Sequence, residues 1–185
     1  RVSLVGSEMC IRDSPRTNLV RNANSTWLIG KPLKQDLEKI LKRDVLIEND
    51  ANCFAISEAF DGAGSKAHTV FGVILGTGVG AGIVIGKKIH KGKNKIAGEW
   101  GHNPLPWANE GELPGKKCYC GRTGCLETFI SGPAIEREFK NLHGSNLNMK
   151  NIVKESVAGN LKAEQVISNL EDRLARALAH VINIL

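Results

Sequence analysis

The stretch CYCGRTGC, residues 118–125, holds three of the five cysteines in a chain of 185 residues. Thiolates are soft ligands, and structural zinc sites take four nitrogen or sulfur ligands in a tetrahedron. Glycines at positions 121 and 124 permit the tight wrap that the spacing C-x-C-x4-C requires. The segment therefore predicts a metal site built on Cys118, Cys120 and Cys125. The alternative interpretation is three reduced cysteines without a metal.

A fourth ligand must come from a histidine outside this stretch. His102 and His143 are the nearest in sequence, and His90 is more distant. We expect His102, because its Gly-His pair lies at the base of the same proline-rich loop. A site with four protein ligands has no open position, so the predicted zinc ion has a structural role.

The composition is that of a protein with a buried core. Hydrophobic residues make up 42% of the chain, which argues against disorder. No run of about 18 apolar residues occurs, and no secretory signal is recognisable. An odd number of cysteines in such a chain argues against a disulfide framework and favours a reducing compartment. These observations predict a cytoplasmic protein.

The formal net charge is +6, and the densest basic stretch is GKKIHKGKNK at 86–95. It would suit a phosphate-bearing partner, but a solvated loop is the preferred interpretation. No aromatic side chains interleave with these lysines, which argues against a stacking surface for nucleic acid. We therefore expect neither a nucleic-acid nor a membrane partner.

Residues 1–13, RVSLVGSEMCIRD, resemble the translation of an adapter oligonucleotide used in transposase-based sequencing libraries. We interpret them as a non-native, adapter-derived tail and exclude them from the fold prediction. The native chain is then expected to begin near Ser14 or Pro15, inside a gene.

Helical and strand-like patterns alternate along the rest of the chain and predict an α/β fold. The expected helices are 32–43, 51–64, 132–142 and 163–185, and the expected strands are 45–50, 69–75 and 83–89. The last two strands flank a glycine turn. Residues 92–117 hold three of the six prolines and predict a long functional loop.

The glycine turn reads GTGVGAG at 76–82. A dinucleotide fingerprint needs G-x-G-x-x-G at the start of a helix, whereas β-branched residues follow here. Backbone N–H groups bared at a hairpin turn can instead cradle phosphate oxygens. The alternative is a tight hairpin that needs glycines for its backbone angles.

Two further segments carry polar side chains suited to a small ligand. In ENDANC, 48–53, a strand ends in Asn49 and Asp50, at the edge where α/β folds bind ligands. Asp50 could be a general base, although either residue could simply cap the next helix. In AGEWGH, 97–102, Glu99 and His102 flank a glycine that allows close approach, and a surface loop explains this segment equally well.

In combination, these motifs resemble the sugar kinases of the repressor–ORF–kinase (ROK) family. NANSTWL at 22–28, GEWGHNPLPW at 98–107 and CYCG-x-x-GC-x-ETFISG at 118–132 are similar to its bacterial fructokinase, or manno(fructo)kinase, branch. The similarity covers about residues 14–185.

The resemblance implies an actin-like, hexokinase-like (ribonuclease H-like) fold of two α/β lobes around a cleft. Residues 14–65 would be a remnant of the N-terminal lobe, ending in the catalytic Asn-Asp segment. Residues 66–185 would be part of the C-terminal lobe, with the phosphate turn and the zinc loop.

The resemblance also implies a role for each matching residue. Asp50 corresponds to the base that takes the proton from the attacking sugar hydroxyl. The expected sugar-binding residues are Asn49, Glu99, His102 and Glu127. The expected phosphate-binding residues are Gly76, Thr77, Gly78 and Gly80, and the expected zinc ligands are His102, Cys118, Cys120 and Cys125. ATP with Mg²⁺ would be the phosphoryl donor.

The implied activity is ATP-dependent phosphorylation of a hexose: fructose to fructose 6-phosphate, with mannose as a second substrate. The family's first phosphate loop, of the D-x-G-G-T type, and its adenosine segment do not occur in this sequence. We therefore expect this chain alone to be inactive, and the intact protein to be a homodimer, as is common in the family.

Three other interpretations stay open. A transcriptional regulator of the same family would carry a helix-turn-helix ahead of the sugar domain. A kinase for glucose, N-acetylglucosamine or mannose would share the same motifs. A zinc-stapled interaction module would have no sugar site at all.

Overall fold

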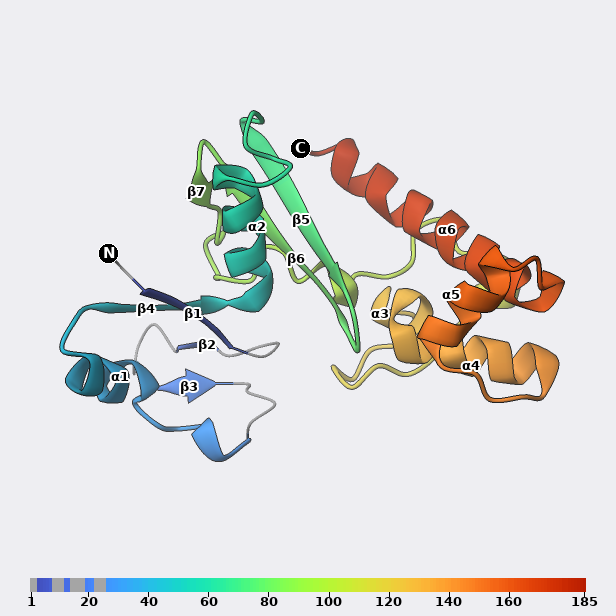
Figure 1. Cartoon of the computed structure of the whole chain (residues 1–185), viewed down its shortest axis with the longest axis horizontal. Helices are drawn as coiled ribbons and strands as arrows, with labels where there is room; N and C mark the ends of the chain where they lie inside the picture. Colours follow the sequence, from blue (N-terminus) through green and yellow to red (C-terminus); the bar gives the residue numbers. More distant parts are fainter. Residues whose placement is uncertain (1–2, 8–11, 14–18, 22–25) are drawn as a thin grey trace. The chain divides into compact units, whose positions relative to one another are not determined.

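The computed structural model describes residues 3–7, 12–13, 19–21 and 26–185, which form two compact units (Figure 1). Unit 1 comprises Arg1–Val73 and Ala81–Gly98, and unit 2 comprises Ile74–Gly80 and Glu99–Leu185. The predicted chain start at Ser14 or Pro15, and residues 22–25 of NANSTWL, lie outside the described residues. The expected lobe boundary between residues 65 and 66 remains a prediction.

The first elements along the chain belong to unit 1. They are β1 (Ser3–Ser7), β2 (Arg12–Asp13), β3 (Val20–Arg21), the 3-10 helix η1 (Thr26–Leu28), α1 (Leu33–Leu41), β4 (Val45–Asn49) and α2 (Asp50–Phe60). Strands β1 and β4 pair in parallel, from Ser3 opposite Val45 to Ser7 opposite Asn49, and β2 pairs with β3 in the antiparallel sense. The predicted helix, strand and helix between residues 32 and 64 are confirmed.

Strand β1 lies within the stretch interpreted as adapter-derived. An exposed strand edge offers backbone donors and acceptors to any extended segment, whatever its origin. The pairing with β4 therefore leaves the interpretation of residues 1–13 as a prediction.

A three-stranded sheet, in the order β5-β6-β7, follows α2. Its strands are β5 (Thr69–Leu75), β6 (Val79–Ile85) and β7 (Lys88–Ile89). Within unit 1, Ala55 and Ala59 of α2 pack with Val84 of β6 in a buried cluster. A Cβ atom at Gly82 would lie only 2.4 Å from the carbonyl oxygen of Ala51, so glycine allows this close approach.

The turn within the glycine stretch 76–82 is shorter than the sequence predicted. Strand β6 begins at Val79, so only residues 76–78 turn, and residues 79–82 are strand. The expected strand 83–89 is likewise divided by a second turn between β6 and β7. The glycines at 80 and 82 belong to a packed strand, although closely spaced glycines are typical of turns.

Unit 2 consists of the proline-rich loop and a group of helices. Its elements are the 3-10 helices η2 (Trp100–His102) and η3 (Glu110–Glu112), followed by α3 (Glu127–Ile130), α4 (Gly132–His143), α5 (Met149–Val157) and α6 (Leu161–Ile182). The helices expected at 132–142 and 163–185 are confirmed, whereas α3 and α5 were missed. Both are short, so their apolar periodicity covers few positions.

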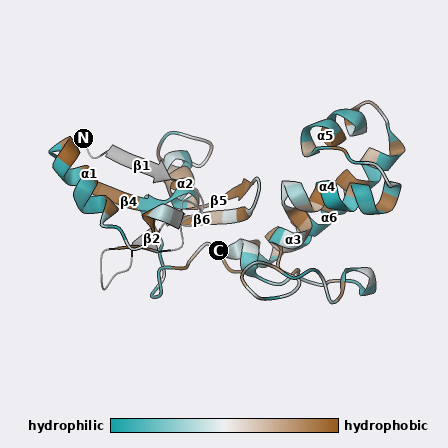
Figure 2. Ribbon diagram, turned by 90° about the horizontal axis from the view of Figure 1, so that it is seen from below, coloured by the Kyte–Doolittle hydropathy of each residue, from teal (hydrophilic) through white to brown (hydrophobic). Residues whose placement is uncertain are grey.

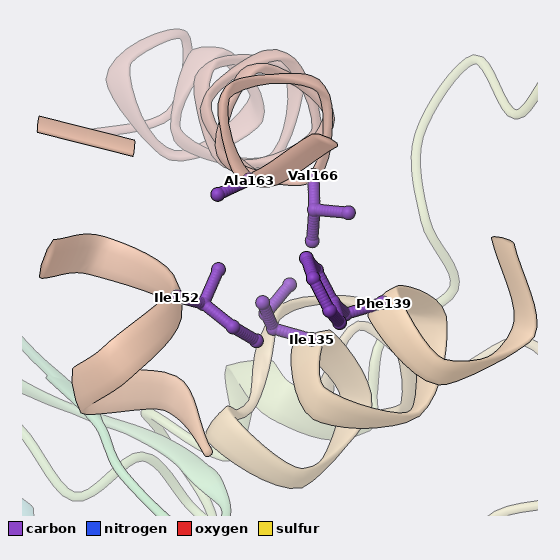
Figure 3. Close-up of a cluster of buried hydrophobic side chains, with 5 residues drawn as sticks. All are labelled: Ile135, Phe139, Ile152, Ala163 and Val166. Atoms are coloured by element: carbon purple, nitrogen blue, oxygen red, sulfur yellow. The ribbon is translucent and has the colours of Figure 1, made fainter. Parts of the chain in front are cut away.

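Side chains from three helices form the core of unit 2. Ile135 and Phe139 of α4 meet Ile152 of α5, and Ala163 and Val166 of α6 close the cluster (Figure 3). Helix α4 begins where the Ser131 hydroxyl accepts a hydrogen bond from the Ala134 N–H.

The surface helix α1 of unit 1 carries hydrophilic and hydrophobic residues side by side (Figure 2). In the part of the chain that the structure describes, no helix combines the length and apolarity that crossing a lipid bilayer requires.

A buried ion-pair network ties the proline-rich loop to α6. Glu112, which is 7% exposed, accepts hydrogen bonds from Arg173 Nε at 2.8 Å and from Arg176 Nη2 at 2.9 Å. Arg173 also pairs with Glu138, and Arg176 with Asp172. Burial alone would raise the pKa of Glu112, but the hydrogen bonds from the two arginines outweigh it and lower the pKa to about 2.

We predict that Glu112→Gln destabilises the chain by about 3 kcal/mol at pH 7, because it leaves two half-buried guanidinium groups without the buried carboxylate that they share. The pKa of Glu112 is lowered from 4.5, so its contribution is fully present above pH 4.5 and is lost as the pH falls toward 2. Urea unfolding of both proteins should show a difference that shrinks over this interval. The control Asp172→Asn, at an exposed carboxylate, should cost under about 0.5 kcal/mol, and a pH-independent difference would contradict the assignment.

Candidate functional site

The predicted metal ligands come together in unit 2. One ligand atom from each of His102, Cys118, Cys120 and Cys125 lies within 4.8 Å of every other. His102 Nδ1 is 3.6 Å from Cys118 Sγ, and the sulfurs of Cys120 and Cys125 are 3.6 Å apart. His143 instead packs against the Phe139 ring. His102, and not His143, therefore lies with the three cysteines, and the cluster could hold a metal ion. The role of the four residues as metal ligands remains a prediction.

The loop that carries the three cysteines is wrapped by its own backbone. The Cys118 N–H donates to the Arg122 carbonyl at 2.7 Å, and the Gly121 N–H donates to the Cys118 carbonyl at 3.0 Å. Gly121 and Gly124 adopt φ angles of +90° and +77°, which are strained for residues with a Cβ. The two glycines therefore allow the tight turn of the cysteine loop, as the sequence predicted.

The charges of the cluster favour a bound cation. Burial is the largest cause that raises the pKa of Cys125, to about 12, and nearby Cys120 and Cys118 add to it. Burial also raises the pKa of Cys118. Three sulfurs in contact cannot all ionise unless a positive charge joins them, and a divalent metal ion supplies that charge. The donor set of three sulfurs and one imidazole is the one that zinc takes in structural sites.

The glycine turn lies against the segments of the cysteine cluster through Val79. The Val79 N–H donates to Glu127 Oε2 at 3.1 Å, and a Cβ atom at Gly101 would lie 2.0 Å from the Val79 carbonyl oxygen. Glu127 Oε1 lies 3.8 Å from Cys118 Sγ. The Gly132 N–H donates to the Gly76 carbonyl at 2.9 Å. The glycine turn, the Gly-Glu-Trp-Gly-His segment and α3 therefore meet within unit 2.

A cavity of about 270 Å³ opens beside this junction. Thr77 of the turn, Tyr119 of the cysteine loop and Glu127 of α3 are among the residues that line it. Three basic side chains, Lys116, Lys117 and Arg137, also line it, and the sequence analysis assigned them no role.

Tyr119 contacts His102, which the sequence did not predict. Its hydroxyl lies 3.0 Å from His102 Nε2, and the two rings meet edge to face at 5.1 Å. One imidazole nitrogen thus faces the sulfurs and the other faces a hydroxyl. Only the fold shows this, because a tyrosine between two cysteines has no sequence signature of its own.

Asn49 and Asp50 lie in unit 1, where β4 ends and α2 begins. Asn49 Oδ1 accepts hydrogen bonds from the N–H groups of Ala51 and Asn52 at 2.9 and 3.3 Å. The capping interpretation therefore holds for Asn49, although its amide nitrogen takes no part in the cap. Asp50 is half-buried, with Oδ1 2.9 Å from the Ala51 nitrogen.

Glu48, for which the sequence predicted no role, stabilises the segment that carries Asn49 and Asp50. Its carboxylate accepts from Asn52 Nδ2 at 3.0 Å and pairs with Lys91. Burial opposes ionisation, but the hydrogen bonds from Lys91 and Asn52 prevail and lower the pKa of Glu48. Lys87 likewise donates to the carbonyl of Ser65 at 2.6 Å. Lys87 and Lys91 are therefore anchored, whereas most of the basic stretch 86–95 is exposed, in agreement with its interpretation as solvated.

The expected base and the four expected sugar-binding residues are divided between the units. Asn49 and Asp50 lie in unit 1, while Glu99, His102 and Glu127 lie in unit 2. Glu99 directly precedes η2, and its carbonyl accepts from the His102 N–H at 3.2 Å. Convergence of all five in one site remains a prediction.

Known proteins with similar sequences and folds are sugar kinases and a regulator. An N-acetyl-D-glucosamine kinase of Pectobacterium carotovorum is 40% identical over 166 residues, covering 88% of this chain and 55% of that protein. A ROK family glucokinase from Streptomyces griseus, solved with glucose and AMPPNP, aligns with a TM-score of 0.72 at 30% identity, covering 85% of this chain and 54% of that one.

A ROK family transcriptional regulator, described as a homologue of the Escherichia coli MLC protein, shares the fold with a TM-score of 0.84 at 24% identity. The alignment covers 98% of this chain and 46% of the regulator. The chain spans about half the length of the curated relatives it matches. The predicted actin-like, hexokinase-like α/β fold is confirmed. The ROK family model matches residues 3–185, and the chain therefore belongs to the ROK family.

Proposed function

We propose that this protein, in its full-length form, is an ATP-dependent hexose kinase. The observation that supports the proposal best is the junction at Val79, which joins the phosphate turn to Glu127 and to the segment carrying His102. A site that transfers a phosphoryl group to a sugar needs both a phosphate cradle and hydroxyl acceptors. Family membership and the kinase relatives agree with this reading.

In the proposed reaction, Asp50 accepts the proton of the attacking sugar hydroxyl. A free hydroxyl is a poor nucleophile, and a carboxylate within hydrogen-bond reach orients it and removes its proton during phosphoryl transfer. Asn49, Glu99, His102 and Glu127 hydrogen-bond the other hydroxyls, and the turn from Gly76 to Gly80 receives the phosphates. Mg²⁺ would neutralise charge on the ATP phosphates.

The metal we propose is a structural zinc ion held by His102, Cys118, Cys120 and Cys125. Zinc would neutralise the thiolates and staple the cysteine loop to η2. His102 Nδ1 faces the sulfurs, which leaves Nε2, now 3.0 Å from the Tyr119 hydroxyl, to meet a sugar hydroxyl. The geometry of the loop would thereby set the geometry of sugar recognition.

Fructose is the first substrate we propose, with mannose second. Its support is the likeness of NANSTWL, GEWGHNPLPW and CYCG-x-x-GC-x-ETFISG to the fructokinase branch. N-acetylglucosamine is the alternative to these two hexoses, because the curated relatives at 38–40% identity carry the name N-acetyl-D-glucosamine kinase. The likeness to a regulator rests on fold alone, and the retained Asp50 and glycine turn favour an enzyme.

We predict one zinc ion per chain, measured by atomic emission on protein purified without added metal. Cys118→Ser and Cys125→Ser should each lose the metal, because both remove a buried thiolate from a four-ligand site. Cys53→Ser is the matched control, since Cys53 lies outside the cluster. Equal zinc content in all four proteins would rule the site out.

Asp50→Asn in the full-length protein should lower kcat by ~10²–10⁴-fold with little change in KM, because an amide cannot accept the proton. Steady-state kinetics with fructose and ATP provide the measurement. Asp61→Asn, at the exposed C-terminal end of α2, is the control and should keep normal kcat. Unchanged turnover in Asp50→Asn would remove Asp50 as the base, and a lack of sugar binding and turnover in the unaltered protein would favour the zinc-stapled interaction module.

The choice of sugar is tested by kcat/KM for fructose, mannose, glucose and N-acetylglucosamine. We expect the value for fructose to exceed that for N-acetylglucosamine by about tenfold or more, because a site shaped around one set of hydroxyls leaves groups unpaired with another. The reverse order would replace fructose by the amino sugar and would leave the kinase assignment intact.

A further inference from the structure

The cavity of unit 2 has an unbalanced positive charge. Lys116, Lys117 and Arg137 line it, whereas Glu127 is the one carboxylate among its lining residues. Glu127 Oε2 is already engaged by the Val79 N–H. Among the described residues, no carboxylate lies within ion-pair distance of any of these three cations.

Arg137 is held in place by neutral groups. Its guanidinium donates to the Thr128 carbonyl at 2.8 Å and to the Pro133 carbonyl at 3.5 Å. Carbonyl oxygens orient the guanidinium without cancelling its charge. Lys116 and Lys117 line the same cavity as Arg137, so three like charges are gathered there. Like charges held together in this way are stabilised when an anion joins them.

The rest of the lining suits a phosphate group. Thr77 and Ser131 supply hydroxyls, and Ser131 is the N-cap of α4, whose 12 residues direct a positive dipole end toward this side. The volume of about 270 Å³ is below the ~300–1,000 Å³ typical of sites for larger ligands. The cavity therefore suits a phosphate group with little else attached, and is small for a whole nucleotide.

We propose that this cavity binds a phosphate monoester group, with Lys116 and Lys117 as its charged ligands and Arg137 as a fixed positive charge beside them. The inference rests on the proposed kinase function. Glu127 lines the same cavity and is an expected ligand of the sugar, so a hexose 6-phosphate could place its phosphate on the cations while its ring stays near Glu127. The terminal phosphate of the nucleotide is the other source of the same chemistry.

The experiment measures binding to the full-length, metal-loaded protein by titration calorimetry at low and at physiological salt. The probes are inorganic phosphate, fructose, fructose 6-phosphate, N-acetylglucosamine 6-phosphate and ADP. The test variant is Lys116→Gln with Lys117→Gln. The matched control is Lys140→Gln with Lys150→Gln, which removes the same charge from exposed positions of unit 2 that do not line the cavity.

We expect the better of the two hexose 6-phosphates to bind about tenfold tighter than its parent sugar, and the test variant to lose about tenfold. The control variant should stay within about twofold of wild type. If ADP loses affinity in the test variant while both sugar phosphates do not, the site stands and the nucleotide is the source. Equal losses in both variants, or no loss in either, would overturn the proposal.

The same data separate this inference from the proposed function. Fructose binding without any lysine-dependent phosphate binding would remove the phosphate site and keep the kinase. Lysine-dependent binding of inorganic phosphate, with no binding of any sugar or sugar phosphate, would keep the anion site and remove the kinase.

Discussion

The backbone of Val79 is the point on which the candidate site of unit 2 depends. Its N–H is bonded to Glu127, and its carbonyl lies so close to Gly101 that no Cβ fits between them. A backbone contact of this kind fixes position more tightly than a side-chain contact, because no rotamer can relieve a clash. This contact brings the glycine turn, the segment of His102 and the start of α3 together.

The cysteine cluster and the Glu112 network differ in how their charges are balanced. At Glu112, two arginines surround one buried carboxylate, and the charges balance within the chain. At the cluster, three thiols and an imidazole converge, and burial raises the pKa of Cys118 and of Cys125. A balanced network needs only the fold, whereas an unbalanced donor set calls for a metal ion. Both sets of contacts hold residues of the proline-rich loop, His102 and Glu112, against other parts of unit 2.

Much of unit 2 was predictable because its signals are local. Spacing and glycines marked the cysteine loop, and apolar periodicity marked α4 and α6. The missed contacts share one cause. Glu48 with Lys91, and Tyr119 with His102, are pairs of residues distant in sequence whose partners only folding selects. Gly82 was read as part of a turn, since its true role, close approach to α2, requires knowing where α2 packs.

By itself, the sequence determined the family, the α/β class, the three cysteines of the candidate metal site and the helix-start role open to Asn49. These follow from residue types at short spacing, where backbone geometry leaves few choices. Only the tertiary structure decided that His102 rather than His143 completes the cluster, and that three unpaired cations share a cavity with Glu127. Contacts between segments distant along the chain depend on how helices and loops pack, and local pattern carries no record of that packing.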